Sequence, residues 1–256
     1  MSRTLQLVIA SALLFASGCA TIGERHTTRH VPDSLIETLA IIEEQGNSWR
    51  SLKAKAKCTL VSPDLSGPKA FKCNLAFKKE DNLRIVSNSL LGRDFDLLIA
   101  GPQLRLSIPG EDIHITDPSE LQGSLLPVGD DPGLAVRMLF QSEPTITALR
   151  ASKEVKRLNR HTWEVKAPLS RGSLTAIVRI DALECSVIRC IIMRSDSESP
   201  EFIAEYGGFK EISGITFPTH MVLLDTAKNT SLRVELKNAA LDPELHRAMF
   251  DVSSVR

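Results

Sequence analysis

The chain has 256 residues, with 31 Lys plus Arg and 31 Asp plus Glu, so its formal net charge at pH 7 is +0. Nucleic-acid binding needs a basic excess clustered on one face, so this balance excludes a nucleic acid as the expected partner. The length exceeds that of a typical single domain but remains within the range of one large all-β domain, and we expect a single domain.

The first 18 residues have the pattern of an export signal. Arg3 precedes a mostly apolar run over residues 5–15, which ends in the small residues of positions 16–18. A helix that spans a bilayer needs about 20 apolar residues, so this run is too short for one and is typical of a cleaved signal peptide. Loss of residues 1–18 removes only the charge of Arg3 and leaves the mature chain close to neutral.

Residues 14–19 read Leu-Phe-Ala-Ser-Gly-Cys and resemble the lipobox of bacterial lipoproteins, in which the cysteine is diacylated before the signal is removed. The resemblance implies that Cys19 is the lipidated first residue of the mature chain and anchors it to a membrane. Ala16 replaces the usual leucine at a position that tolerates alanine. Ala20, rather than an aspartate, follows the cysteine, which implies sorting to the outer membrane, facing the periplasm. The alternatives are a secreted protein in which Cys19 is an unmodified thiol and a cytosolic chain with an apolar start.

The polar segment 19–31 is expected to be a flexible tether, and residues 32–256 the single domain. Ser34 and Glu37 form a capping-box pattern, and apolar residues follow at helical spacing. We therefore predict an amphipathic helix over residues 33–46.

From residue 52 the period of the pattern changes to two residues, with apolar residues alternating with lysines up to residue 60. The same alternation returns over residues 71–78, 95–99, 104–108, 174–180 and 232–236. It predicts antiparallel strands with one apolar face and one solvated face. Short helices are predicted at residues 133–141 and 243–250, with Phe250 entering the core.

The predicted order is therefore one helix, about six strands, a second helix, about seven strands and a short terminal helix. This is a mainly β fold with a few helices (α+β). A sheet of more than about ten strands tends to curl, and its apolar face must be closed by the helices around a packed core or a cavity.

The first two strands contain Cys58 and Cys73. If these two residues lie opposite each other, Ala56 meets Leu75 and Leu60 meets Phe71, so that every apolar residue faces another. An exported protein meets an oxidising compartment, and we predict a disulfide between Cys58 and Cys73. The alternative is two buried thiols.

The remaining pair, Cys185 and Cys190, has opposite parity in an extended strand. These cysteines can bridge only if a turn or bulge lies between them. We expect Cys190 in the core and Cys185 near the preceding turn.

The sequence contains no nucleophile elbow, no His-Glu-x-x-His, no phosphate-binding loop and no dinucleotide fingerprint. Asp94 and Asp96 share a strand face, an arrangement that acid/base catalysis can use. A solvated face beside Arg93 explains them more simply. Without closely spaced Cys or His pairs, a zinc site is not expected. We expect no enzymatic activity, catalytic residue, cofactor or metal, and a hydrolase is the least favoured alternative.

This layout resembles that of the LolA/LolB-like half-barrel proteins, which carry lipoproteins or lipids across the periplasm. The local likeness lies in residues 90–99, Gly101, the strand at 104–109 and the stretch from Tyr206 to Pro218. The resemblance implies a curved antiparallel sheet that forms a half-barrel, a hydrophobic cavity on its concave face, helices that act as its lid, and no catalytic residues. A lipid anchor fits the membrane-anchored LolB branch. No ligand-binding residue can be transferred individually.

The expected function is that of an envelope lipoprotein that binds a lipid or acyl chain in the half-barrel, in lipid or lipoprotein transport or localisation. The alternative is a structural or interaction lipoprotein that scaffolds a protein partner of unknown identity through an exposed sheet edge.

Overall fold

A computed structural model of the chain describes residues 31–79, 81–89, 92–108, 111–115, 126–127, 131–141, 144, 146–169, 173–194, 197 and 199–251. Residues Val31–Arg256 form one compact unit. The predicted signal peptide, Cys19 and the predicted tether up to residue 30 lie outside the described residues. Among the helices that are described, none has the length and apolar character needed to cross a bilayer.

The unit begins with helix α2 (Leu35–Asn47), and the Ser34 Oγ accepts a hydrogen bond from the Glu37 backbone N–H at 3.2 Å. The capping box predicted from these two residues is therefore confirmed at its N-cap. Antiparallel strands follow: β1 (Ser51–Val61), β2 (Lys69–Lys78), β3 (Asn82–Ser89), β4 (Gly92–Ala100), β5 (Gln103–Ile108) and β6 (Glu111–Ile115).

Two short helices, α3 (Pro132–Leu139) and α4 (Ile146–Ala151), separate these strands from the second set. The predicted helix at 133–141 corresponds to α3, whereas α4 was not predicted. The second set comprises β7 (Glu154–Arg157), β8 (Thr162–Pro168), β9 (Leu174–Asp181), β10 (Ser186–Arg194), β11 (Pro200–Gly207), β12 (Lys210–Ile212), β13 (Ile215–Phe217), β14 (His220–Asp225) and β15 (Thr230–Leu241). The 3₁₀ turn η2 (Arg247–Phe250) ends the described chain.

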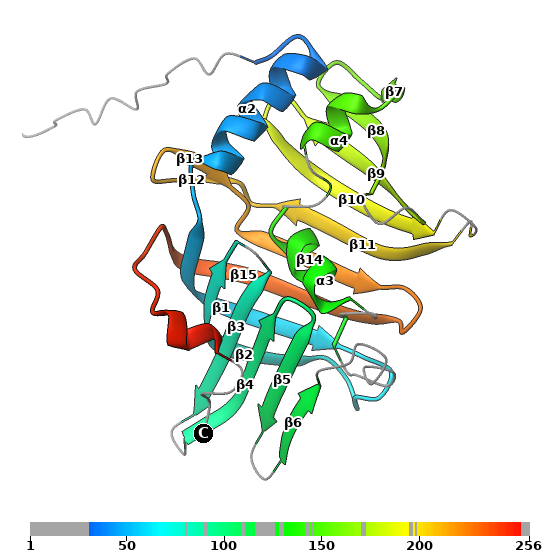
Figure 1. The fold of residues 1–256 in the computed structure, drawn as a ribbon. Helices are drawn as coiled ribbons and strands as arrows, with labels where there is room; N and C mark the ends of the chain where they lie inside the picture. The colour runs from blue at the N-terminus through cyan, green and yellow to red at the C-terminus, as the bar shows by residue number, and fades with distance from the viewer. Residues whose placement is uncertain are drawn as a thin grey trace, which may run out of the picture. The chain divides into compact units, whose positions relative to one another are not determined.

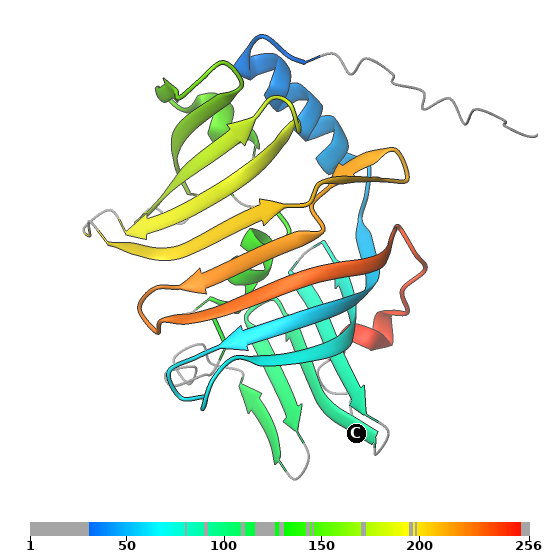
Figure 2. The same cartoon turned by 180° about the vertical axis from the view of Figure 1, so that it is seen from behind.

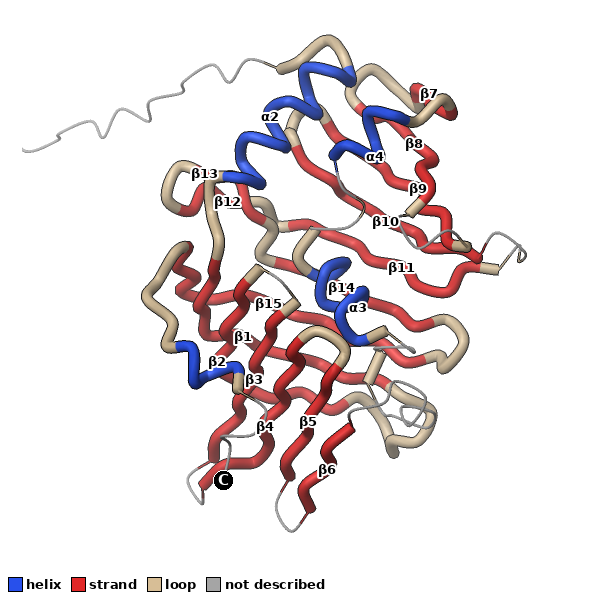
Figure 3. Tube along the Cα trace, in the orientation of Figure 1, coloured by secondary structure: helices blue, strands red, loops and turns tan. Residues whose placement is uncertain are grey.

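One large antiparallel sheet organises the described part of the unit. It has thirteen strands in the order β6-β5-β4-β3-β2-β1-β15-β14-β11-β10-β9-β8-β7, and β12 and β13 form a separate hairpin. The first strand, β1, pairs with the last, β15, in the interior of the sheet. The sheet curves around helix α3, while α2 and α4 lie over the end formed by β8–β10 (Figures 1 and 3). The predicted fold class, a curved antiparallel sheet with few helices, is confirmed.

The alternation of side chains decides which face of the sheet is buried. In β1, Leu52, Ala54, Ala56 and Cys58 are buried, and the three lysines between them are exposed. The buried set joins one continuous apolar core that includes residues of α3 and of both halves of the sheet. The predicted division into one apolar and one solvated face therefore holds at the centre of the sheet.

The register of β1 and β2 differs from the prediction by two residues. Cys58 lies opposite Phe71, and Cys73 lies opposite Ala56. The two cysteines are therefore diagonal neighbours on the same buried face. The two-residue shift keeps every side chain on its predicted face because side-chain direction repeats every two residues along a strand. The apolar pattern alone could not distinguish the two registers.

The C-terminal turn covers the outer face of β3 and β4 instead of entering the core. Arg84 makes hydrogen bonds of 3.0 and 2.6 Å to the two carboxylate oxygens of Asp96, which is 2% exposed. The same guanidinium donates to the Met249 carbonyl at 3.1 Å and so fixes η2 to the sheet. The prediction that Phe250 enters the core is wrong, because Phe250 belongs to this outer turn and is only half-buried.

Replacing Asp96 by Ala removes both charge-assisted hydrogen bonds and leaves the mostly buried Arg84 guanidinium without its carboxylate. We expect the free energy of unfolding, measured by urea titration, to fall by about 3 kcal/mol. The matched control is Glu164→Ala, which breaks the more exposed pair with Arg179 and is expected to cost less than about 1 kcal/mol. If the two variants lose equal free energy of unfolding, Arg84 and Asp96 do not hold the C-terminal turn against the sheet.

Candidate functional site

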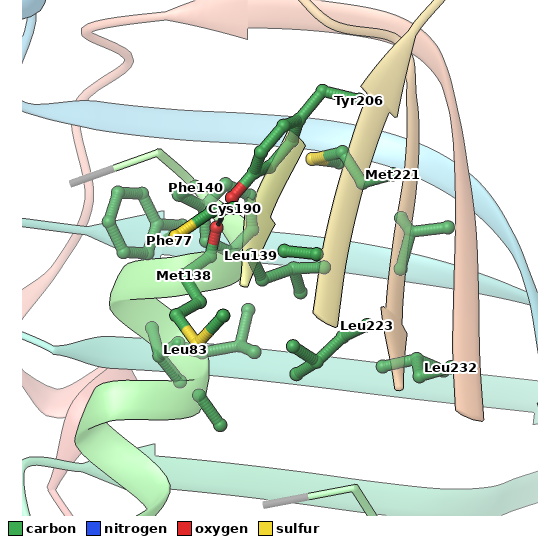
Figure 4. Packing of buried hydrophobic residues seen from close by; sticks show 14 of the residues in the cluster. Phe77, Leu83, Met138, Leu139, Phe140, Cys190, Tyr206, Met221, Leu223 and Leu232 are labelled. Carbon is green, nitrogen blue, oxygen red and sulfur yellow. Dashed lines mark hydrogen bonds between the residues drawn. The ribbon is translucent and has the colours of Figure 1, made fainter. Parts of the chain in front are cut away.

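Helix α3 occupies the concave face of the sheet. Seven of its eight residues are buried, all except Arg137. At its C-terminal end, the buried Tyr206 hydroxyl of β11 donates to the Met138 carbonyl (Figure 4). The Gln141 side-chain amide donates to the Val187 carbonyl of β10 at 2.6 Å. Burial raises the pKa of the Tyr206 phenol well above its ordinary value, so this hydroxyl remains a donor at neutral pH.

The N-terminal end of α3 is attached to the other half of the sheet. The Asp131 side chain caps the helix by accepting from the Leu134 N–H at 3.1 Å. Arg137 pairs with Asp81, which lies in the β2–β3 turn. A Cβ at Gly133 would lie only 3.3 Å from the Gly101 carbonyl in the β4–β5 turn, so a glycine permits this close approach. Helix α3 thus joins the two halves of the curved sheet.

Little space remains beneath α3. The apolar void between this helix and the sheet measures about 20 Å³ and is lined by residues such as Leu83, Leu139, Leu223 and Leu232. Figure 4 shows these side chains packed between the helix and the strands. Ligand pockets usually measure about 300–1,000 Å³. Among the described residues, α3 therefore fills the part of the concave face where a cavity was expected.

A larger cavity, of about 320 Å³, lies beside the core at the end of α2. Its walls come from α2, the residues after α3, the start of α4, the start of β10 and strand β13. The described residues that line it include Ile42, Gly46, Trp49, Lys79, Phe140, Ile146, Val187 and Phe217. Its volume lies at the lower end of the range for ligand pockets.

Aromatic rings form one side of this cavity and continue into the core. Phe77 stacks on Phe140 with ring centroids 4.1 Å apart. Trp49 lies 5.8 Å from Phe77 and meets Phe217 edge to face at 5.2 Å. These four rings come from the segment between α2 and β1, from β2, from the residue that follows α3 and from β13. The sequence analysis placed Phe77 in a strand and did not connect it with the other three.

One ammonium group lies at this aromatic wall. The Nζ of Lys79 lies 4.4 Å from the Trp49 ring centroid and donates to the Gly46 carbonyl at the end of α2. Burial, with a smaller contribution from the nearby positive charge of Arg50, lowers the pKa of Lys79 below its ordinary value. An anion that enters the cavity would favour the charged form of this group. The sequence analysis missed Lys79 because it continues a strand whose lysines otherwise point to solvent.

The predicted cysteine sites have different outcomes. The sulfurs of Cys58 and Cys73 lie 3.3 Å apart as buried thiols without a covalent bond. The hydrogen bond with Cys73, together with burial, raises the pKa of Cys58, while the same hydrogen bond lowers the pKa of Cys73. The disulfide stays a prediction. Cys190 lies in the core as expected, and Cys185 is buried at the end of the β9–β10 turn with a φ of 45°.

The described residues offer no cluster suited to metal binding or to catalysis by paired carboxylates. No group of three or more His, Cys, Asp or Glu side chains gathers among them. Asp96 is paired with Arg84, and the side chains of Arg93 and Asp94 lie outside the described set. Among the described residues that line the cavity, the charged side chains are Lys79 and Glu43, and Glu43 pairs with Arg150 at 2.7 Å. The site therefore offers an apolar aromatic wall beside the Lys79 ammonium group, an arrangement suited to binding an amphiphile.

Comparison with solved structures identifies the fold. A DUF1329 family protein from Desulfovibrio piger matches with a TM-score of 0.59 and 10% identity, covering 88% of this chain and 100% of that one. A proposed outer membrane lipoprotein-sorting domain from Vibrio parahaemolyticus matches with a TM-score of 0.55 and 11% identity, and the match covers 85% of this chain and 97% of that one. A LolA superfamily protein from Nitrosomonas europaea matches with a TM-score of 0.52 and 12% identity, and the match covers 85% of this chain and 99% of that one. No model of a protein family and no curated protein matches the sequence.

These matches define the unit as a half-barrel of the LolA-like fold. The resemblance inferred from the order of helices and strands is therefore confirmed at the level of the fold. At 10–12% identity, the comparisons assign no residue of the cavity.

The hydrogen bond between Tyr206 and the Met138 carbonyl can be tested by Tyr206→Phe. We expect the free energy of unfolding to fall by about 1 kcal/mol and the amide hydrogens of α3 to exchange about fivefold faster, because one buried anchor of the helix is lost. The control Ser152→Ala removes a hydroxyl that donates to the Lys166 carbonyl at the sheet edge and is expected to change stability by less than about 0.5 kcal/mol. Unchanged exchange in α3 contradicts the anchoring role.

Proposed function

We propose that this chain is a lipoprotein of the bacterial cell envelope, anchored through Cys19, that binds an anionic amphiphile such as a fatty acid or another acylated molecule. The acyl chain lies against the aromatic wall formed by Trp49, Phe140 and Phe217. The acidic head group pairs with Lys79. This activity serves the transport or localisation of lipids or lipoproteins and needs no catalytic residue.

The observation that carries the proposal is the partly desolvated ammonium of Lys79 beside the apolar wall of the 320 Å³ cavity. Burial removes hydration from this cation, and the negative charge of Asp242 offsets the loss only in part. An incoming anion would restore more of that lost stabilisation. The LolA-like fold supports the acyl-binding role by analogy, because the Vibrio parahaemolyticus structure is described as a lipoprotein-sorting domain. Analogy of fold alone does not assign a ligand.

The direct test compares a fatty acid with the fatty alcohol of the same chain length. We expect Lys79→Gln to weaken fatty-acid binding by at least about tenfold, since a hydrogen bond to a charged group contributes about 1.5–3 kcal/mol. Binding of the alcohol should change little. Titration calorimetry with the exposed Lys153→Gln as the matched control measures both. Equal effects of Lys79→Gln on the two ligands contradict the assignment of the head-group site.

The same site predicts the pH dependence of binding. Because the pKa of Lys79 is lowered in the protein, its positive charge is present below that lowered pKa and is lost as pH rises through it. Fatty-acid affinity should therefore fall over that range in the parent chain. In the Lys79→Gln variant, fatty-acid affinity should not change over the same pH range.

The lipid anchor is tested separately in cells of a bacterium that processes lipoproteins. We expect Cys19→Ala to move the chain from the membrane fraction to the soluble periplasmic fraction, because the acyl chains that hold it are absent. The fold of residues 31–256 should persist, as judged by an unchanged urea midpoint. A variant that still sediments with membranes after a salt wash contradicts the anchor at Cys19.

A further inference from the structure

The outer face of the three central strands carries a cluster of exposed lysines. Lys53, Lys55 and Lys57 alternate along β1, Lys72 lies on β2, and Lys237 lies on β15. We call these five residues the lysine face. They lie on the side of the sheet opposite α3, the side that β15 (orange) and β1 (cyan) present to the viewer in Figure 2.

The register places like charges directly opposite one another on this face. Lys57 lies across from Lys72, and Lys55 lies across from Lys237. These three strands contribute one carboxylate to this face, that of Glu235. It lies opposite Lys57 in the register of β1 and β15 but forms no ion pair with that lysine. Like charges in opposed positions destabilise a sheet. The protein therefore keeps these lysines together at a cost to its own stability.

The other half of the sheet shows a different arrangement. On the outer faces of β8–β11, arginines pair with carboxylates on the neighbouring strands: Arg179 with Glu164 and Arg189 with Glu205. At the end of β10, Arg194 pairs with Glu201 of β11. The chain as a whole has a net charge of +0. The positive and negative charges are therefore balanced over the whole chain but not over its surface, because cations lie together on β15, β1 and β2.

We propose that the lysine face is a docking surface for an anionic lipid bilayer. The side chains between the lysines, Thr59, Asn74 and Ala76, are small, so this face has no aromatic rings for stacking on bases, as single-stranded nucleic acids require. Val61, at the end of β1, is exposed on the same side of the sheet, but no large apolar side chain lies between the lysines for insertion into a bilayer. Lysine ammonium groups act as point charges, which suits a diffuse layer of lipid phosphates. The choice of a bilayer rests on the envelope location proposed above.

The test uses residues Val31–Arg256, which form one compact unit with its own core. Sedimentation with vesicles made of equal parts phosphatidylglycerol and phosphatidylcholine measures binding at low salt. Each basic residue near an anionic surface contributes about fivefold to the partition coefficient. We expect the combined Lys55→Gln, Lys57→Gln and Lys72→Gln variant to bind about 100-fold more weakly. Vesicles of phosphatidylcholine alone, or raised salt, should abolish binding by the parent unit.

The matched control carries Lys153→Gln, Lys156→Gln and Lys210→Gln, which remove the same charge from exposed positions elsewhere. It should retain most of the binding. Equal losses in the two triple variants, or no vesicle binding by the parent unit, overturn the proposal. Tighter binding to a DNA oligonucleotide or to an acidic protein than to the vesicles also overturns it.

Two further measurements separate docking from a structural role and from ligand binding. The neutralised lysine-face variant should unfold at the same or a higher urea concentration, because repulsion is relieved, and the Lys→Arg version of the three substitutions should restore vesicle binding. A marked loss of stability, or no recovery with arginine, contradicts the proposal. Fatty-acid affinity should be unchanged in the lysine-face variant, and vesicle binding should be unchanged in Lys79→Gln.

Discussion

The docking of α3 across the concave face is the constraint on which the rest of this structure depends. The helix is attached at one end to the turns of Asp81 and Gly101 and at the other end to β10 and β11 through Gln141 and Tyr206. Its apolar residues fill the space that a bound lipid could otherwise take. A cavity of ligand size lies next to the end of this helix, where Phe140 meets the aromatic wall.

Helix α3 connects the two halves of the sheet, which come from successive parts of the chain. Strands β1–β6 form one antiparallel set, strands β7–β11 with β14 and β15 form the next, and β1 pairs with β15 where the two sets meet. A sheet of this size curls, and the curl brings the inner faces of the two sets toward each other. Contacts from α3 to β3 and β4 on one side and to β14 on the other join these sets into one core.

Local pattern was sufficient to predict α2, α3, the strands with clear alternation and the buried face of the sheet. It did not predict α4 or which strands are neighbours. The Ser34 cap and the alternation along β1 depend on residues close in sequence, and both are confirmed. The register of Cys58 and Cys73 was wrong because two registers give equally apolar pairs. The cavity was missed because Trp49, Lys79, Phe140 and Phe217 come from four separate segments. The lysine face was missed because the pairing of β1 with β15 joins residues about 180 positions apart, such as Lys55 and Lys237.

The proposed anchor and the proposed docking surface have different physical consequences. Several acyl chains on Cys19 would hold the chain on a membrane without help, since each buried methylene contributes about 0.8 kcal/mol. The lysine face would therefore not be needed for retention, and its proposed effect is on orientation. A unit on a flexible tether can rotate freely, but five lysines facing an anionic surface favour one side of the sheet. That side is opposite α3, so the proposed docking would direct the concave face, with the cavity beside the end of α3, away from the bilayer and toward a partner that delivers or receives the ligand.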